Sequence, residues 1–308
     1  MILCVTPSPA IDRTARVDRL TYGAVLRPTE VVVLPGGKGN NVARAADRLG
    51  ALVTTTGFAA GHAGRWLVEA LDTEGLNPRF VPVAGETRTT YVTVDASGRS
   101  VLVYEPGTPV TAVDLEALRD LVETDLLPTA SWVAMCGAPP PGMGSDAYAA
   151  LVDASHSAGR PCLVDVSGEA LAAVLAARPD VVKVSREEAD SVAGVRGVDA
   201  LAAACALVAR GAALAVVTDG PHGAAAADAW TTWQVQVPPI RAVDPIGSGD
   251  AFTAGFIVAL DAGGTIAEAL TNAAAAGTAN AESVGAGRFD LARQVDLAGG
   301  IRVTRRNR

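Results

Sequence analysis

Short runs rich in valine, leucine and isoleucine alternate along most of the chain with longer alanine- and leucine-rich stretches of helical spacing. The short runs predict β-strands at residues 2–6, 52–56, 132–136, 161–165, 180–184 and 213–218. The longer stretches predict helices at 40–49, 64–74, 114–125, 146–158, 169–177 and 198–210. Such alternation is typical of a mostly parallel sheet with helices on both faces. The strands around Leu163 and Val181 are almost entirely apolar, as expected for strands buried on both sides.

Two regions, from about 12 to 34 and from 87 to 105, interrupt this alternation because they carry strands with no helix between them. Apolar and polar residues alternate on either side of an Ala96-Ser-Gly98 turn, which is typical of an antiparallel hairpin with one face in solvent. We expect both regions to form one small sheet inserted into the larger body. A sheet attached at one edge is suited to act as a lid or to pair with another subunit. The last eight residues, 301–308, hold four arginines and predict a solvent-exposed tail.

The composition indicates a large core that needs no cross-links. Of the 308 residues, 49% are hydrophobic and 19% are charged, and a chain of this size buries about 75% of its unfolded surface. The four cysteines lie far apart, without a CxxC pair or a histidine at zinc-ligand spacing, and their apolar neighbours predict buried, reduced thiols. The length fits one domain over 1–308 that includes the inserted sheet.

The charge balance restricts the classes of partner. There are 25 Lys and Arg residues against 33 Asp and Glu, which gives a net charge of -8 and a pI near 5.0. Binding along a phosphate backbone requires an excess of basic residues, so we expect no nucleic-acid partner. A small anionic substrate requires only a local basic cluster. Residues 1–7 lack the features of a signal peptide, and no apolar window approaches about 18 residues, so we expect a cytoplasmic protein without a membrane partner.

A glycine-rich turn opens the predicted helix at 40–49 and reads Pro35-Gly-Gly-Lys-Gly-Asn-Asn41. Glycines before a helix N-terminus allow backbone N–H groups to approach a ligand, and the helix dipole favours negative charge there. The turn matches neither a Walker A loop nor the Rossmann spacing. Because glycine is the default turn residue, the turn taken alone is equally compatible with a structural role.

A second glycine-rich turn precedes an apolar helix and reads Asp244-Pro-Ile-Gly-Ser-Gly-Asp-Ala-Phe252. The proline favours an extended approach, after which Gly247 and Gly249 expose consecutive N–H groups at the start of the helix. Asp250, in the first helical turn, is explained either as a partner of the helix dipole or as a base that accepts a hydroxyl proton. On the second interpretation the turn is an anion hole for a phosphoryl group in transfer.

Together the two turns resemble the signature regions of the ribokinase-like, PfkB-type carbohydrate kinases. The resemblance extends from Pro9-Ala-Ile-Asp12 to Ala275-Ala-Gly-Thr278. It is strongest to the sugar-phosphate kinases of that family, through the strings Gly39-Asn-Asn-Val-Ala-Arg44, Gly85-Glu-Thr-Arg88 and Glu105-Pro-Gly107. It implies an α/β fold, a ribokinase-like three-layer sandwich with a mostly parallel central sheet and a small β-sheet lid.

The resemblance also implies roles on the sugar side. Asp12 corresponds to the residue that hydrogen-bonds the sugar hydroxyls, and a carboxylate suits this because it accepts two hydroxyl donors. Gly36, Gly37 and Asn41 correspond to further sugar contacts. Three lid-side cations, Arg27, Lys38 and Arg88, match residues that hold the phosphate already on the sugar. For Arg27 and Arg88 a solvated charge at a strand edge is the alternative.

On the nucleotide side the resemblance implies ATP and Mg²⁺. The segment Thr218-Asp-Gly220-Pro-His-Gly223 resembles the loop over the ATP phosphates and ribose, and Lys183 a lysine near those phosphates. Gly277 and Asn280 correspond to the helical region that lines the adenine pocket, although such helices are more often tightly packed. Glu188 corresponds to the glutamate that positions magnesium through water.

The sequence departs from the family pattern at three positions. Ser185 replaces an asparagine in the segment that ends at Glu188, which affects the expected metal affinity more than the reaction type. Ala138 replaces a serine whose hydroxyl would contact the sugar phosphate, so the choice of substrate can differ. Ser248 replaces an alanine in the second glycine turn and keeps its backbone donors.

The resemblance therefore predicts an ATP-dependent sugar-phosphate kinase. Asp250 would act as the base, the N–H groups of Gly247, Ser248 and Gly249 would hold the transferring phosphoryl group, and the small sheet would close over the sugar. Fructose 1-phosphate, converted to fructose 1,6-bisphosphate, is the favoured substrate, ahead of tagatose 6-phosphate and fructose 6-phosphate. An unphosphorylated sugar or nucleoside is disfavoured by Arg27 and Arg88. A non-catalytic sugar-phosphate-binding protein is the alternative of another class, and the exposed face of the small sheet predicts a homodimer.

Overall fold

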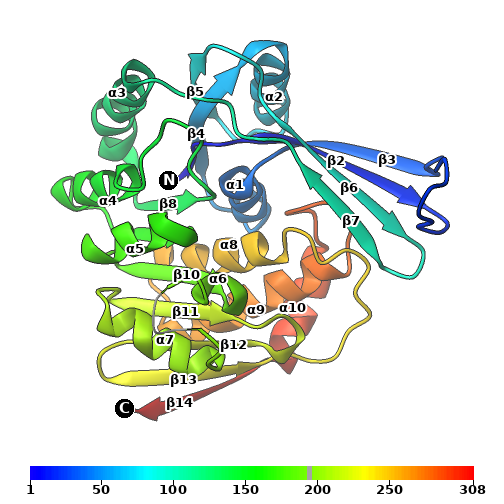
Figure 1. Ribbon diagram of the computed structural model, residues 1–308. Coiled ribbons are helices and arrows are strands. Elements are labelled where there is room, and N and C mark those ends of the chain that lie inside the picture. Colours follow the sequence, from blue (N-terminus) through cyan, green and yellow to red (C-terminus); the bar gives the residue numbers. More distant parts are fainter. Residues whose placement is uncertain (193–195) are drawn as a thin grey trace.

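The computed structural model describes residues 1–192 and 196–308 and contains a ten-stranded central sheet (Figure 1). Its strands lie in the order β14-β13-β12-β11-β10-β9-β8-β1-β4-β5. The pairs from β11 through β5 are parallel, and the three pairs from β11 to β14 are antiparallel. The strands are β1 (Ile2–Thr6), β4 (Val53–Ala60), β5 (Pro78–Val83), β8 (Trp132–Cys136), β9 (Cys162–Asp165), β10 (Val181–Ser185), β11 (Leu214–Thr218), β12 (Ala224–Ala227), β13 (Thr231–Gln236) and β14 (Arg302–Asn307).

Helices cover both faces of this sheet. Successive residues of each strand point to opposite faces, and because both sets are apolar in the buried strands, both faces must be covered. In β1, Leu3 and Val5 belong to one hydrophobic core, whereas Ile2 and Cys4 belong to the other. The first core is covered by α3 (Ala112–Asp120), α4 (Ala147–Ser157), α5 (Gly168–Ala176) and α7 (Ala200–Ala209). The second is covered by α1 (Lys38–Arg48), α2 (Gly61–Thr73), α8 (Ser248–Asp261), α9 (Ile266–Ala281) and α10 (Leu291–Gly300). The three-layer, mostly parallel α/β architecture is therefore confirmed.

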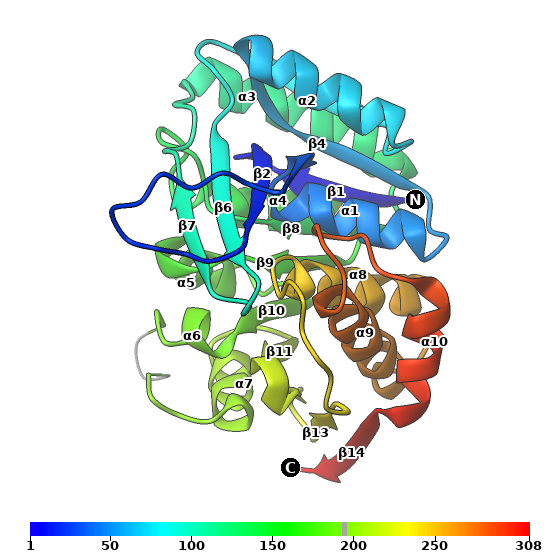
Figure 2. The same ribbon diagram turned by 90° about the vertical axis from the view of Figure 1, so that its right-hand side faces the viewer.

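A separate four-stranded sheet, called the small sheet below, projects from one side of the body (Figures 1 and 2). It has the order β3-β2-β6-β7, with β2 (Ala10–Val17), β3 (Glu30–Gly36), β6 (Thr89–Asp95) and β7 (Ser100–Tyr104). The two regions that interrupt the strand–helix alternation thus form one inserted sheet, as predicted. Its central pair, β2 and β6, is parallel, and only the outer pairs are antiparallel.

All six predicted strands and all six predicted helices are present. The strands at 2–6 and 132–136 have the predicted bounds, and the other elements have shifted ends. The helix predicted at 114–125 is an α-helix only to Asp120 and continues as a wider π-helical turn, Leu121–Leu126. Strands β5, β12 and β13 lie outside the predicted set. Two of these have weak strand signals: β12 consists of four alanines, and β5 contains two prolines.

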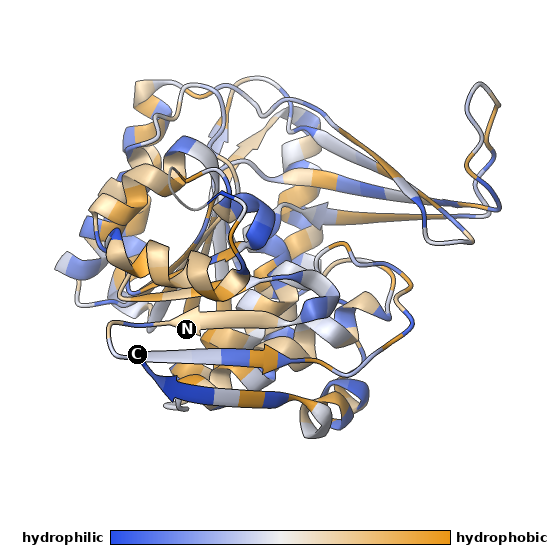
Figure 3. Ribbon diagram, turned by 60° about the horizontal axis from the view of Figure 1, so that its bottom comes forward, coloured by the Kyte–Doolittle hydropathy of each residue, from blue (hydrophilic) through white to orange (hydrophobic). Residues whose placement is uncertain are grey.

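The predicted solvent exposure of residues 301–308 is largely confirmed, but the prediction that they form a tail is wrong. Residues 302–307 form β14, which pairs with β13 along its full length and closes one edge of the central sheet. Its side chains are mostly exposed and basic, and in Figure 3 the strand is mostly blue. Exposed arginines are compatible with a strand because backbone hydrogen bonds, rather than side-chain burial, hold an edge strand in place.

The fold brings the ends of its buried strands together. Because β8, β9, β10 and β11 run parallel, Cys136 pairs with Asp165 and Ser185 with Thr218 at the carboxyl edge. This edge is where α/β sheets commonly carry their ligand sites. Among the described residues, no helix combines the length and apolar character needed to cross a membrane.

Candidate active site

Two helix N-termini meet at the carboxyl edge of the sheet. Gly37 is the N-cap of α1, and Gly247 is the N-cap of α8, with positive φ values of 100° and 77°. The helices are joined by a buried hydrogen bond in which Asn41 Nδ2 donates to Asp250 Oδ2 over 2.9 Å. The structure thus brings together the two glycine-rich turns, which lie about two hundred residues apart in the sequence.

Glycine is required at two positions in these turns. A Cβ atom at Gly36 would lie 1.9 Å from Asp12 Oδ2, so the strand end can approach the carboxylate only without a side chain. A Cβ at Gly247 would lie 2.3 Å from the Cβ of Ala286, and its φ already favours glycine. Gly36 therefore lets the strand end lie against the Asp12 carboxylate, and Gly247 lets the second glycine turn pack against Ala286.

Asp250 lies in the first turn of α8, and only 7% of its surface is exposed. Burial raises the pKa of its carboxyl group to about 6, while the nearby charge of Lys38 lowers it, that of Asp165 raises it and the Asn41 bond lowers it. A carboxylate with a pKa close to neutrality is well matched to take a proton from a hydroxyl group and later release it.

Asp165 is the most enclosed charge in the site and is absent from the residues predicted from the sequence. Its carboxylate is fully buried and accepts hydrogen bonds from Lys38 Nζ, Lys183 Nζ and Thr253 Oγ1 at 2.9, 2.9 and 3.2 Å. Burial alone would raise its pKa, but the two ammonium groups outweigh this and hold it well below the usual range. The available signal was a carboxylate at the carboxyl end of an apolar parallel strand.

Lys38 connects this centre to α6 (Arg186–Ala189). Besides Asp165 it donates to Glu188 Oε1 over 2.6 Å, and although burial would lower its pKa, the carboxylates of Asp165, Glu188 and Asp250 raise it. Lys38 lies on the body side of the site, so its expected placement on the lid side is wrong. As a charge fixed at the start of α1 beside Asp250, it still faces the place where an anion would bind.

Lys183 lies on β10 and points to the second glycine turn, because a Cβ built on Gly249 would be 3.0 Å from Lys183 Nζ. With 3% of its surface exposed, it is almost completely buried. Two ammonium groups thus flank Asp165 next to the N-terminus of α8. This arrangement suits a negatively charged group held between the lysines and the backbone N–H groups of residues 247–249.

The small sheet brings Asp12 close to the first glycine turn. Asp12 is aligned with Thr90 across β2 and β6, and Thr90 Oγ1 donates to Asp12 Oδ1 in a short hydrogen bond. Burial raises the pKa of Asp12, while Thr90, the charges of Arg44 and Arg88, and the N–H of Gly37 counteract that rise. Asp12 therefore combines a held position with acceptor capacity for a hydroxyl-bearing ligand.

Arg88 lies directly before β6 and faces Asp12. Its Nη2 donates to the Ser8 carbonyl over 3.2 Å, but Nε is buried without a partner among the described residues. Burial lowers the pKa of Arg88, and the charge of Asp12 counteracts this. A partly buried guanidinium group with an unused, buried Nε donor suits an anionic ligand. Tyr104, which sequence reasoning missed, is aligned with Thr90 on the same face and interacts electrostatically with Asp12 and Arg88.

Arg27 is not brought to this cluster. It is exposed in the loop between β2 and β3, beyond the Arg16–Glu30 pair at the far end of the hairpin. Among the described residues it has no hydrogen bond or ion pair. A role for Arg27 in holding the sugar phosphate therefore stays a prediction, and within one chain the charge available for it near Asp12 comes from Arg88.

The predicted nucleotide loop follows β11 at the same sheet edge as Asp165. Thr218 ends the strand beside Ser185, and Gly220 begins a 3-10 turn, Gly220–His222. Gly223 has a φ of 90°, and a Cβ there would lie 2.0 Å from the Val235 carbonyl. Residues 220–222 are exposed, so a nucleotide could contact the loop there, and this contact remains a prediction.

Gly277 and Asn280 lie behind the second glycine turn. A Cβ at Gly277 would be 2.9 Å from the Ser248 carbonyl, so α9 packs directly against α8 there. Asn280 is fully buried, donates to the Ile246 carbonyl over 2.9 Å and accepts the Gly287 N–H over 2.8 Å. Both residues brace the turn, and their direct contact with a nucleotide stays a prediction.

The structure also shows the surroundings of the three residues that depart from the family pattern, Ser185, Ala138 and Ser248. Ser185 caps α6: its hydroxyl oxygen accepts the Glu188 N–H over 3.1 Å, and Glu188 Oε2 accepts the Ser185 N–H over 2.8 Å. Ser185 therefore orients Glu188. Ala138 is exposed just after β8, and Ser248 receives a long hydrogen bond of 3.4 Å from Asn280.

Glu188 fits a water-mediated contact to Mg²⁺. Its carboxylate is partly exposed and uses one lone pair of each oxygen for Lys38 and Ser185, so further acceptor positions remain. Mg²⁺ prefers oxygen ligands and usually keeps several waters, which suits a carboxylate that contacts the ion through water rather than directly.

Comparison with known proteins agrees with this geometry. The family model described as pfkB family carbohydrate kinase matches residues 2–292. The structure superposes on phosphofructokinase-2 from Escherichia coli with a TM-score of 0.88 and 27% identity, covering 97% of this chain and 98% of that one. For a possible 1-phosphofructokinase from Thermotoga maritima the TM-score is 0.87 with 25% identity over 99% of both chains. Ribokinase from Thermotoga maritima, at 19% identity and a TM-score of 0.76 over 97% and 99%, shares the fold.

The raised pKa of Asp250 predicts a pH-dependent cost to stability. The folded state retains this proton up to about pH 6, whereas the unfolded chain loses it near the ordinary value of 3.8. Stability therefore falls as pH rises between these values, and Asp250→Asn should raise the free energy of unfolding by on the order of 2 kcal/mol above that window.

Thermal and urea unfolding from pH 4 to 8 would measure this difference. The gain from Asp250→Asn should disappear towards about pH 4, near the ordinary value of 3.8. The control is Asp153→Asn, at an exposed aspartate of α4, which should change little at any pH. A gain that is the same at every pH would contradict the prediction.

Proposed function

Because this chain belongs to the pfkB family of carbohydrate kinases, we propose that it transfers the γ-phosphoryl group of ATP to fructose 1-phosphate and forms fructose 1,6-bisphosphate. The coarser activity, an ATP-dependent sugar-phosphate kinase, agrees with its similarity to phosphofructokinase-2 and to a possible 1-phosphofructokinase. The observation that carries the proposal is Asp250, a buried carboxylate with a pKa of about 6 at the N-terminus of α8.

Phosphoryl transfer depends mainly on positioning and charge. In the proposed mechanism the primary hydroxyl of the sugar gives its proton to Asp250 as its oxygen attacks the γ-phosphorus, and ADP leaves in line. The N–H groups of Gly247, Ser248 and Gly249 face the charge that develops on the phosphoryl oxygens. Lys38 and Lys183, fixed by Asp165, add positive charge on the same side. Magnesium held through Glu188 would neutralise part of the charge of the ATP phosphates.

The acceptor is proposed to be a sugar that already carries a phosphate. Asp12, Gly36, Gly37 and Asn41 would contact its hydroxyl groups, and Arg88 its phosphate. The buried Nε of Arg88, which has no partner among the described residues, supports this, because a buried donor without a hydrogen-bond partner is costly unless a ligand accepts from it. A phosphofructokinase-2 structure from Escherichia coli holds fructose-6-phosphate, which makes fructose 6-phosphate one alternative acceptor, and the family resemblance makes tagatose 6-phosphate another.

The nucleotide side of the proposal uses the loop after β11. Thr218, Gly220 and Gly223 would close over the ATP phosphates and ribose, with Gly277 and Asn280 supporting the adenine side. A cytoplasmic location is also proposed, supported by four free cysteines, which are typical of a reducing compartment.

A non-catalytic sugar-phosphate-binding protein is the competing class. Only Ser185 and Ala138 favour it. The capping role of Ser185 weakens this support, since the serine holds Glu188 in place. Asp250 and the second glycine turn have the residues that catalysis requires.

The direct test is ADP release with Mg-ATP and, separately, fructose 1-phosphate, fructose 6-phosphate and tagatose 6-phosphate. We expect turnover with fructose 1-phosphate as the best acceptor. Asp250→Asn should lower kcat by about 10²- to 10⁴-fold because it removes the base while retaining the shape. Binding of a sugar phosphate to folded protein without turnover would favour the non-catalytic alternative.

Arg88 provides a test of the acceptor class. Arg88→Ala should raise KM for the sugar phosphate about tenfold to hundredfold, since a charge-assisted hydrogen bond to an anion is lost. The control is Arg119→Ala, at an exposed arginine of α3, which should leave KM unchanged. An unchanged KM in Arg88→Ala would favour an unphosphorylated sugar or nucleoside.

A homodimer through the small sheet is also proposed. The face of the sheet that carries Arg13 rather than Asp12 is apolar and solvent-exposed, with Tyr91 42%, Val101 53% and Val103 56% exposed. Pairing with a second copy would cover this face. One form of phosphofructokinase-2 from Escherichia coli is a tetramer, so related chains do assemble.

Light scattering on purified protein tests this surface. We expect a dimer for the natural chain and a monomer for Val103→Asp, because a carboxylate would have to be desolvated at the interface. Val113→Asp, at an exposed valine of α3, should remain dimeric. A natural chain that is monomeric at assay concentrations would overturn the proposal.

A further inference from the structure

Arg44 lies at the point where the segments of the active site meet, yet it faces no predicted ligand. It is one turn along α1 from Asn41, and only 6% of its surface is exposed. Its guanidinium group uses its donors in four directions: Nε bonds Glu74 Oε2 at 2.7 Å, Nη1 bonds Asn41 Oδ1 at 3.1 Å and the Ala286 carbonyl at 3.3 Å, and Nη2 bonds the Pro35 carbonyl at 2.6 Å.

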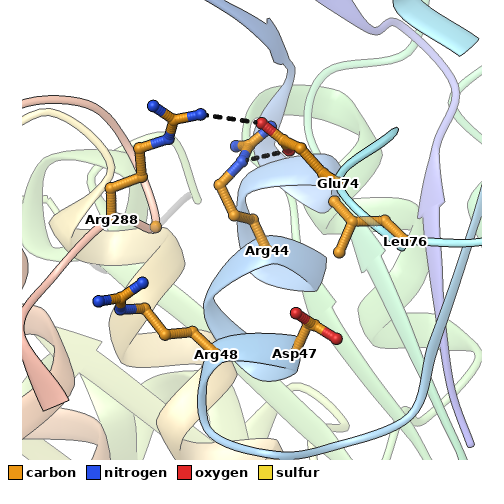
Figure 4. A pocket seen from close by; sticks show the side chains of 7 residues that line it. Arg44, Asp47, Arg48, Glu74, Leu76 and Arg288 are labelled. Atoms are coloured by element: carbon orange, nitrogen blue, oxygen red, sulfur yellow. Dashed lines mark hydrogen bonds and ion pairs between the residues drawn. The ribbon is translucent and has the colours of Figure 1, made fainter. Parts of the chain in front are cut away.

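Each of these contacts reaches a different part of the site. Pro35 precedes Gly36, which approaches Asp12, and Ala286 is the residue against which Gly247 packs. Asn41 donates to Asp250. Figure 4 shows Arg44 on α1 reaching towards Glu74, which also binds Arg288 at 3.1 Å from the other side. A chain of charge-assisted hydrogen bonds thus runs from Arg288 and Glu74 near the surface through Arg44 and Asn41 to Asp250.

The orientation of the Asn41 amide determines how these hydrogen bonds act on Asp250. An asparagine side chain has an acceptor oxygen and a donor nitrogen on either side of one bond, and a half rotation exchanges them. Because Arg44 Nη1 is donor-only, it selects the orientation in which Oδ1 faces Arg44. Nδ2 is then fixed towards Asp250 Oδ2, where it stabilises the ionised carboxylate.

We propose that Arg44 is a positioning residue for the catalytic base, which acts through Asn41 by fixing the amide so that it donates to Asp250. The proposal deepens the proposed function and rests on it, because it assumes that Asp250 is the group that accepts the substrate proton. Lysine could not replace Arg44, since a single ammonium group cannot span Glu74, Asn41 and the Pro35 carbonyl.

Other charged groups around Asp250 also affect its pKa, independently of the hydrogen bonds through Arg44 and Asn41. Lys38 from α1 and Lys183 from β10 favour its ionised form, and Asp165 from β9 favours its protonated form. The phenol of Tyr104 from β7 and the thiol of Cys136 from β8 are neutral neighbours. A variant that keeps all of these and the charge at position 44 isolates the effect of orientation.

Arg44→Lys is such a variant, and the measurement is the titration of the Asp250 carboxyl carbon by NMR in protein labelled at aspartate. The signal is assigned by its loss in Asp250→Asn. We expect the midpoint to rise by about one pH unit in Arg44→Lys, since a hydrogen bond to the ionised form is weakened. The acidic limb of the kcat/KM profile should move with it.

Arg48→Lys is the matched control. Arg48 lies one turn further along α1, is exposed, and bonds the Phe289 carbonyl rather than any member of the chain. It should leave the midpoint unchanged. If Arg44→Lys does not fold, Glu74→Ala releases Nε of Arg44 and should move the midpoint upward by a smaller amount. Removal of a negative charge would by itself move it downward, so the sign identifies the cause.

The Asn41→Ala background separates positioning from a general structural effect. If Arg44 acts through Asn41, Arg44→Lys should produce no further shift once the amide is absent. The same shift in both backgrounds, or no shift in either, would overturn the proposal. If no sugar phosphate is turned over, the proposed function fails, but the carboxyl titration still decides whether Arg44 and Asn41 control Asp250.

Discussion

The site depends on a buried carboxylate that must be neutralised. Asp165 has no exposed surface, and an unpaired charge in such a place would destabilise the fold by about 3–5 kcal/mol. It is paired with Lys38 from α1 and Lys183 from β10, and Thr253 from α8 adds a third donor. The requirement to satisfy one charge therefore holds two helices and two strands in a fixed relation. The same requirement leaves two ammonium groups at the edge where negative charge would gather during phosphoryl transfer.

Asp250 is also buried, but its pKa is raised, whereas that of Asp165 is lowered. Its main partner is a neutral amide, and its pKa remains near 6 because the environment does not fully compensate for the loss of water. The two carboxylates thus have pKa values shifted in opposite directions: two ammonium groups contact Asp165 directly and lower its pKa, whereas Asp250 is bonded by a neutral amide and its pKa is raised. This separation is typical of sites in which one acidic group has a structural role and the other exchanges protons.

Much of this arrangement could be predicted from the sequence. The strand–helix alternation identified the central sheet, and the two interruptions identified the small sheet. The second glycine turn identified Asp250, and the resemblance to the family identified Asp12 and Asn41. The partners of the charged side chains could not be predicted. Lys38 was expected beside Arg88 but pairs with Asp165, which carries no local motif, and the string that ends at Arg44 does not indicate that this side chain reaches Ala286. Pairing of this kind depends on distances between segments more than a hundred residues apart. The strand at 302–307 was missed for a related reason, because an edge strand requires no apolar pattern.

That edge strand has a consequence for the behaviour of the protein in concentrated solution. A ten-stranded sheet leaves unpaired backbone groups along its outermost strand, and such a row is a template for attachment of another chain. Here the row is accompanied by Arg302, Arg305 and Arg306, all exposed, on a molecule whose overall charge is negative. Two copies that approach through these strands would bring like charges together. Repulsion between these arginines would therefore disfavour edge-to-edge pairing of two copies into a longer sheet.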